Sequence, residues 1–283
     1  MKVRPSPIVG RWYPGDPDVL VADLDRYLGQ VDRQPPPGKV WGVVAPHAGY
    51  RYSGPVAAYA FECLRNLRPD LVVVVSPLHQ AHGDPILTTP YQFYETPLGQ
   101  VPVDQAALNQ LNRMLCEQLG YGLGLLYRDH EHAIEIELPF LQYLVGSFRL
   151  LPLMVCDQSS PVAKGLGLAL ARVLRTQKVL FVASSDLSHF YPLPVANNFD
   201  DELLNRVAAF DPEGVIAADV EGTGFACGRG AIAAVLWATQ ALGANRVNIL
   251  RHATSGDVTG EYGTVVGYGA AVIWQAGEEE GDS

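Results

Sequence analysis

Short β-branched, apolar runs alternate along this chain with longer amphipathic stretches, and this alternation limits the fold more than any other property. Six runs are predicted strands: residues 40–45, 71–76, 150–155, 179–183, 247–251 and 264–273. The first four are apolar nearly throughout, as expected for strands that helices cover on both faces. A chain that alternates strands and helices in this way is typical of an α/β protein with a parallel or mixed sheet.

The amphipathic stretches are predicted helices: residues 18–28, 55–67, 105–119, 133–145, 161–176, 195–209 and 230–242. Three have start signals: Ser53 ahead of Pro55, Asp104 ahead of Gln105, and Ser160 ahead of Pro161. The Pro-rich stretch 34–38 is the only candidate linker, and it lies too near the N-terminus to separate two domains. We therefore expect a single α/β domain over residues 1–276, with a mixed, largely parallel sheet flanked by helices. Residues 277–283 are predicted to be an acidic flexible tail.

Composition excludes several classes of protein. Of the 283 residues, 48% are hydrophobic and 18% are charged, which supplies a buried core and is unlike a disordered chain. The net charge of −10 argues against nucleic acid or an anionic membrane as the main partner. The N-terminus lacks the apolar region of a secretory signal, and no apolar run is long enough to cross a membrane. The four cysteines form no CxxC pair, so we expect no disulfide framework, no zinc finger and a cytoplasmic location.

Histidines follow three of the predicted strands. His47 comes just after the strand 40–45, His79 just after 71–76, and His189 a few residues after 179–183. Ligands of open α/β sheets bind beyond the carboxyl ends of the strands. Neutral imidazole is the commonest metal ligand, so two histidines on rigid strand ends would preorganise half of a metal site. The third could complete the site or act as an acid or base.

Cys227 lies in the glycine-rich segment 224–230, directly before the predicted helix 230–242. A helix N-terminus and a nearby cation or metal both favour the thiolate, so we expect Cys227 to join the site. The other three cysteines lie in apolar helices or at a strand end, where core packing is the better interpretation.

A second polar cluster covers residues 129–132 and continues into the predicted helix 133–145. His132 and Glu135 share one helical face, but the spacing is not that of the HExxH zinc proteases. We expect His132 beside the pocket, behind a metal ligand or against the substrate, and His130 and His82 at the surface.

These residues lie in segments that resemble the Memo family, whose bacterial and archaeal members are named AmmeMemoRadiSam system protein B. The likeness runs from about Arg4 to Trp274. Its segments in chain order are Arg4-Pro5, Trp12-Tyr13-Pro14, 45–50, Ser53-Gly54, 76–79, 131–135, 138–141, 184–189, 226–228 and 254–257.

The Memo family is in turn similar to the LigB-type class III extradiol dioxygenases, in which two histidines and a glutamate bind Fe(II) and another histidine is the base. The resemblance implies an α/β fold with a metal site at the strand ends. By position it implies the metal ligands His47, His79 and Cys227, with the cysteine in place of the carboxylate. It also implies three catalytic residues in the same pocket: His189 as the base, Asp186 and His132.

The thiolate shifts the expected chemistry. Two histidines and a carboxylate leave a facial iron site open, whereas a soft thiolate favours copper, zinc or thiolate-bound iron. We expect a divalent or redox-active metal ion, with iron as the first candidate and copper or zinc as alternatives. Three functions stay open: a metal-dependent redox enzyme, a peptide- or partner-binding module that retains the metal pocket, and a zinc-dependent hydrolase.

The expected partners follow from the same pocket. Its ligand would be a small molecule or a peptide bound at the strand ends. The resemblance further implies partnership with AMMECR-type and radical SAM proteins, which accompany members of this family.

Overall fold

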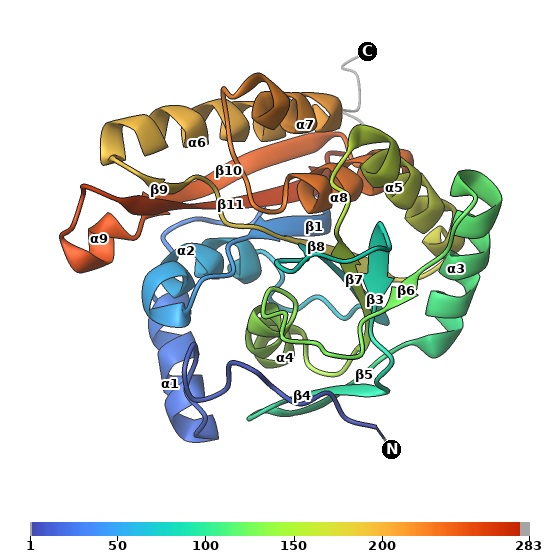
Figure 1. Cartoon of the computed structure of the whole chain (residues 1–283). Coiled ribbons are helices and arrows are strands. Elements are labelled where there is room, and N and C mark those ends of the chain that lie inside the picture. The colour runs from blue at the N-terminus through green and yellow to red at the C-terminus, as the bar shows by residue number, and fades with distance from the viewer. Residues whose placement is uncertain (1, 278–283) are drawn as a thin grey trace, which may run out of the picture.

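A mixed β-sheet forms the centre of the computed structural model, which describes residues 2–277 (Figure 1). Within those residues the sheet joins nine strands: β1 (Lys39–Ala45), β2 (Leu71–Pro77), β3 (Ile86–Thr88), β6 (Gly124–Leu125), β7 (Arg149–Val155), β8 (Val179–Ser184), β9 (His189–Tyr191), β10 (Arg246–Thr254) and β11 (Val265–Gln275). A separate hairpin pairs β4 (Phe93–Thr96) with β5 (Gly99–Pro102). All six predicted strands are present. The others were not predicted because two to four residues are too few to show a period.

The strand order is β10-β11-β1-β8-β2-β7-β3-β6, and β9 pairs with β11 at the edge of this path. The four central strands β1, β8, β2 and β7 are parallel, whereas β11 pairs antiparallel with both β1 and β10. This arrangement confirms the predicted mixed sheet. Because β1, β8 and β2 are neighbours with one direction, their carboxyl ends open at the same edge.

Helices cover both faces of the sheet (Figure 1). One face carries α3 (Gln105–Leu119), α5 (Ser160–Leu174), α6 (Leu193–Ala208), α7 (Pro212–Glu221) and α8 (Arg229–Ala241); the other carries α1 (Pro17–Leu28), α2 (Tyr50–Glu62) and α4 (Leu138–Val145). A short turn, η1 (Glu135–Glu137), leads into α4, and α9 (Gly256–Thr259) follows β10. The predicted α/β fold with flanking helices is confirmed.

One predicted helix, α2, is wrongly placed in the sequence. Its start was predicted at Ser53 and Pro55, but the helix begins at Tyr50 and contains Pro55. The backbone N–H of Tyr50 donates to the carbonyl of Trp12 at 2.8 Å, and the Ser53 hydroxyl donates to the carbonyl of Ala48. A contact with a distant segment therefore anchors the first turn, and no local start signal reports it.

Two other differences between the predicted and the observed helices have local causes. The capping residue of α5 is Ser159 rather than Ser160, and α7 was not predicted at all. The segment that opens α7, Asp211-Pro212-Glu213-Gly214, has the composition of a turn, yet Asp211 caps a helix there by accepting from the backbone N–H of Gly214. The predicted cap of α3, Asp104, is confirmed by its bond from the Ala107 N–H.

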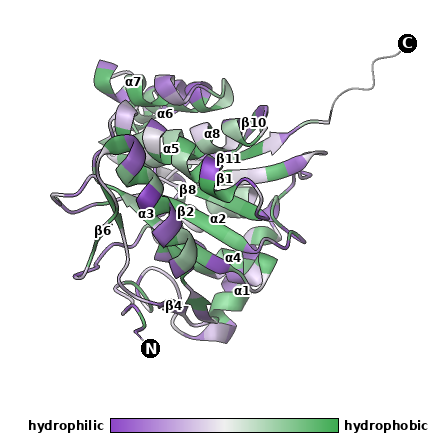
Figure 2. Cartoon of the chain, turned by 90° about the vertical axis from the view of Figure 1, so that its right-hand side faces the viewer, coloured by the Kyte–Doolittle hydropathy of each residue, from purple (hydrophilic) through white to green (hydrophobic). Residues whose placement is uncertain are grey.

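The central strands are apolar and buried along their whole length. Every residue of β2 and β8 is buried, and Figure 2 shows these strands in green between the helical layers. Burial on both faces explains why their sequences are continuously apolar. The described chain has no helix of the length and hydropathy needed to cross a bilayer. The predicted acidic tail lies, beyond Gly277, outside the described residues.

Candidate metal centre

The parallel strand ends bring together the three side chains predicted as metal ligands. His47 follows β1 and His79 follows β2, while Cys227 precedes α8. One donor atom from each residue lies within 4.8 Å of the other two. The Sγ atom of Cys227 is 3.1 Å from Nε2 of His47, and the two imidazole rings meet edge to face with centroids 5.2 Å apart.

Ser184, at the end of β8, fixes the tautomer of His47. Its hydroxyl donates to the carbonyl of Ala133, so it must accept from Nδ1–H of His47, 2.9 Å away. Nε2 of His47 therefore carries a lone pair directed toward Cys227. The ring is 1% exposed, and this burial, together with the neighbouring histidines, lowers the pKa of His47 well below its ordinary value. The imidazole is thus neutral, as a metal ligand must be.

Glu131 orients His79 in the same manner. Its carboxylate accepts from the backbone N–H of His79 at 2.7 Å and from Nδ1–H of the ring at 2.9 Å. Burial alone would raise the pKa of Glu131, but the hydrogen bond and charge of His79 lower it to about 2, so the carboxylate is ionised. Nε2 of His79 remains as the free ring nitrogen. A carboxylate behind a ligating histidine is a recurring arrangement in metal sites.

Cys227 differs from the expectation for a reactive thiolate. Its Sγ accepts the backbone N–H of Asp186 at 3.2 Å, but burial, with the Asp186 carboxyl nearby, raises the pKa of the thiol well above its ordinary value. In the metal-free chain burial therefore opposes the thiolate that the start of α8 was predicted to favour. A bound cation would be needed to deprotonate this thiol.

Asp186 and His189 face the same cavity from the segment after β8. Asp186 accepts the backbone N–H of His47 at 2.8 Å, and burial raises its pKa to about 7 despite that hydrogen bond. Nδ1–H of His189 donates to the carbonyl of Leu187 at 2.9 Å, which leaves Nε2 as an acceptor. Burial also lowers the pKa of His189. The Asp186 carboxyl can therefore exchange a proton near neutral pH, whereas burial favours the neutral form of His189.

His132 lies between the ligand cluster and the N-terminal segment. Its ring stacks on His79 with centroids 4.7 Å apart, and Trp12 packs on its other side at 4.2 Å. Burial lowers the pKa of His132 to about 4, even though Glu131 opposes that shift. His132 and His79 also lie with Glu131 in a second potential ligand group. The Glu131 oxygens already accept several N–H groups, so an orienting role suits this carboxylate better than a ligating one.

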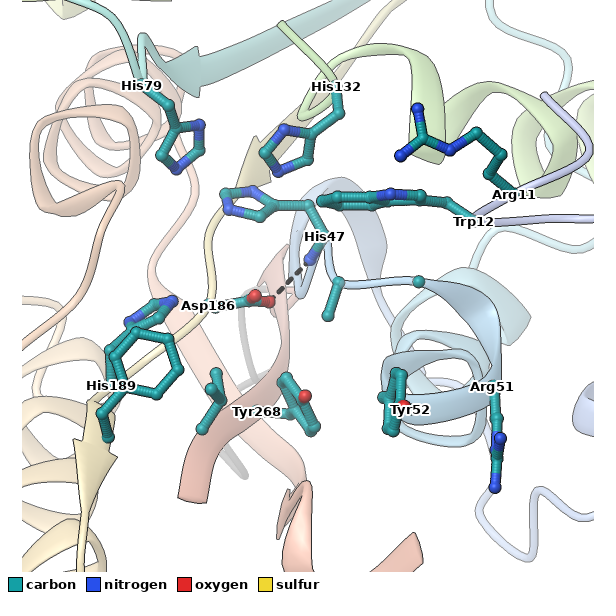
Figure 3. Close-up of a pocket in the computed structure, with 14 residues that line it drawn as sticks. Arg11, Trp12, His47, Arg51, Tyr52, His79, His132, Asp186, His189 and Tyr268 are labelled. Carbon is teal, nitrogen blue, oxygen red and sulfur yellow. Dashed lines mark hydrogen bonds between the residues drawn. The ribbon is translucent and has the colours of Figure 1, made fainter. Parts of the chain in front are cut away.

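His47, His79 and His132 line a cavity of about 570 Å³ (Figure 3). In Figure 3 the rings of His47, His79 and His132 gather at one end, and His189 lies beside Asp186. The remaining lining includes the aromatic side chains of Trp12, Tyr52, Phe190 and Tyr268 and two cationic ones, Arg11 and Arg51. Phe190 is 72% exposed and has a φ of 64°, a conformation that is costly for a residue other than glycine and that recurs at functional sites.

Comparisons with known proteins match nearly the whole length of this chain. The model of the Memo-like protein family matches residues 4–272. The chain belongs to the Memo family. Similar relatives are two proteins described as MEMO1 family proteins: one from Thermotoga neapolitana is 36% identical over 284 residues, which cover 96% of this chain and 99% of the relative. The other, from Nitrosopumilus maritimus, is 32% identical over 275 residues, which cover 95% and 98%. The family resemblance predicted from short motifs is confirmed.

The donor set of this Memo-family chain fits a metal ion. The Nε2 atoms of His47 and His79 are the ring nitrogens left for an ion, because the Nδ1 atoms bond Ser184 and Glu131, and a sulfur lies beside them. Burial alone would lower the pKa of His79, but Glu131 raises it, so an ion would displace a proton there more readily as pH rises. Hydrogen bonds of this kind hold ligands at a fixed orientation before metal binds. His47 and His79 line the cavity, so an ion held by these residues and Cys227 would be accessible from it.

Sequence reasoning missed the residues behind the ligands. Glu131 and Ser184 lie in the Memo-like segments 131–135 and 184–189, but no role was predicted for either. His252 was also missed: its Nε2 bonds Asp200 at 2.8 Å, and Asp200 holds the segment that leads to His189 by accepting the backbone N–H of Ser188. The predicted surface positions of His82 and His130 agree with their exposure.

Proposed function

We propose that this Memo-family chain is a metal-dependent redox protein that holds iron or copper through His47, His79 and Cys227. One observation carries the proposal: one ring nitrogen each of His47 and His79 and the Sγ of Cys227 lie within 4.8 Å of one another, and both histidines line an open cavity. This donor set combines nitrogen and soft sulfur, which suits iron, copper and zinc and is unsuited to magnesium or calcium.

Each neighbouring group has a distinct task. A bound iron or copper would supply one-electron chemistry toward O2 or a small oxidant. Nε2 of His189 accepts a proton from a ligand in the cavity, and the Asp186 carboxyl holds or releases one because burial raises its pKa to about 7. The aromatic side chains of the wall would pack on a ligand, and Arg11 and Arg51 would suit an anionic group on it. Catechol ring cleavage is not part of the proposed function, because a thiol stands where ring-cleaving relatives have a carboxylate.

The test is elemental analysis with metal-edge spectroscopy on protein purified without chelators and without a polyhistidine tag. We expect near-stoichiometric iron or copper with a sulfur ligand. The double variant His47→Ala/His79→Ala should lose the metal, whereas the control His82→Ala/His130→Ala, which removes two exposed histidines, should keep it. Full occupancy in the first variant would refute the proposal, and zinc as the native metal would favour hydrolysis instead.

A second candidate function is the recognition of a peptide or protein partner at the same cavity. The observation that favours it is the exposed aromatic rim, where Phe190 is 72% and Tyr52 is 36% exposed. Exposed aromatic side chains are enriched at binding hot spots. Tight association with an AMMECR-type or radical SAM protein that persists without metal and in Cys227→Ser would support this function. Loss of that association on metal removal would count against it.

A further inference from the structure

A buried arginine near the start of the chain holds the loop behind the candidate ligands. Arg4 is 3% exposed, and its guanidinium makes a two-pronged ion pair with Asp129, with Nε–Oδ2 at 2.5 Å and Nη2–Oδ1 at 2.9 Å. Nη1 lies 2.5 Å from Glu135 Oε2, and Nη2 also donates to the carbonyl of Glu131. A buried charge is tolerated only when it is paired in this way, and the planar guanidinium fixes the geometry of all its partners.

Glu131 carries this constraint to a metal ligand. Its carboxylate accepts four N–H groups: the backbone and Nδ1 of His79 at 2.7 and 2.9 Å, and the backbones of His132 and Ala133 at 2.9 and 3.0 Å. Arg4 binds the carbonyl of the same residue. Glu131 therefore contacts the Arg4 guanidinium through its carbonyl and the His79 ring through its carboxylate, and Nε2 of that ring is the atom offered to the ion.

The other end of the N-terminal segment contacts the same site. The Tyr13 hydroxyl donates to Glu135 at 2.7 Å, so Glu135 binds both ends of the segment. Trp12 packs on His132, and its carbonyl accepts the first N–H of α2 from Tyr50. The segment thus bridges the loop that carries Glu131 and the helix that follows His47.

We propose that Arg4 is a positioning residue for the metal centre, which holds Glu131 so that the carboxylate keeps Nδ1 of His79 protonated and Nε2 directed at the ion. The metal part of this inference rests on the proposed function. The part that concerns the tautomer of His79 does not, because it follows from hydrogen bonds within the chain.

The metal test uses Co²⁺, whose thiolate charge-transfer band reports coordination by sulfur. Arg4→Met should weaken Co²⁺ binding about 10–100-fold and alter the spectrum, as expected when a partner behind a ligand is lost. Arg4→Lys should fall between Arg4→Met and wild type, because an ammonium cannot make the two-pronged pair. The control Arg149→Met removes another arginine–aspartate pair, with Asp104 at 2.6 Å, and should bind Co²⁺ as wild type does.

The second test reads the His79 tautomer in metal-free protein by ¹⁵N NMR, at a pH where the ring is neutral. Wild type should show Nδ1–H alone, and Arg4→Met should show a mixture. If Arg4→Met does not fold, the triple variant Arg4→Met/Asp129→Asn/Glu135→Gln removes the stranded charges and takes its place. A folded variant with wild-type Co²⁺ affinity and a single tautomer would overturn the inference. If wild type bound no Co²⁺, the proposed function would fail, and the tautomer alone would decide the role of Arg4.

Discussion

Replacing Ser184 with alanine should remove the hydrogen bond that orients the ring of His47. Ser184 is fully buried, donates its hydroxyl hydrogen to the Ala133 carbonyl and accepts Nδ1–H of His47. Alanine leaves both groups without this partner inside the protein. A buried polar group left without a partner costs about 1–3 kcal/mol, so the free energy of unfolding should fall by about that amount.

The same substitution should weaken metal binding for a separate reason. Without the serine, His47 satisfies its ring by moving the proton to Nε2, where Cys227 Sγ lies 3.1 Å away as an acceptor. That proton then occupies the atom that would bind the ion. We expect metal affinity to fall about 10–100-fold, which corresponds to about 1.4–2.8 kcal/mol.

Co²⁺ titration and urea unfolding, measured on the same samples, separate the two effects. The matched control is Thr239→Val, which removes a fully buried hydroxyl that donates to carbonyls within α8, away from the site. The control should lose stability, by about 1 kcal/mol, but keep wild-type affinity. If Ser184→Ala folds and binds Co²⁺ as tightly as wild type, the serine does not set the tautomer of His47 and the reasoning fails.

Two further predictions concern stability. Burial raises the pKa of Asp186 to about 7, so its carboxyl binds a proton more tightly in the folded chain than in the unfolded chain, and its stabilising contribution is lost as pH rises from about 4 to 7. Between pH 4 and 7 the unfolding free energy of metal-free wild type should fall, relative to that of Asp186→Asn, by up to about 1.4 kcal/mol per pH unit. Urea unfolding measured at several pH values checks this, and the same pH dependence in both proteins would contradict it.

Gly267→Ala should lower the free energy of unfolding by about 1–3 kcal/mol, because a Cβ there would lie 1.9 Å from Oδ2 of the buried Asp200. The control is Gly83→Ala, where nothing lies within 4 Å of the added Cβ, and it should leave the melting temperature unchanged. If Gly267→Ala and Gly83→Ala melted at the same temperature, Asp200 would have moved aside at no cost.

The central sheet could be predicted because its signal is local. A strand buried on both faces must be apolar throughout, and β2 and β8 have this property in sequence and in structure. His47 and His79 could be nominated for the same reason, since each directly follows such a strand and parallel neighbours end at one edge. Cys227 was nominated from a different local signal, its place in a glycine-rich segment directly before a helix.

The supporting residues could not be predicted because their partners are distant in the chain. Arg4 binds Asp129 across 125 positions, and Ser184 binds His47 across 137. A polar residue such as Glu131 has the same local signature whether it faces solvent or holds a metal ligand. The prediction of where α2 begins failed for the same reason, because the first N–H of this helix donates to the carbonyl of Trp12.

The place of β11 in the sheet has a consequence for biosynthesis. This strand, Val265–Gln275, is the last one in the described residues, yet it lies directly beside β1, which leads into His47. Both histidines thus leave the ribosome before Cys227 and the neighbouring strand. An ion that met the emerging histidines would have neither a third donor nor a dry surrounding, so we expect loading to follow the synthesis of β11.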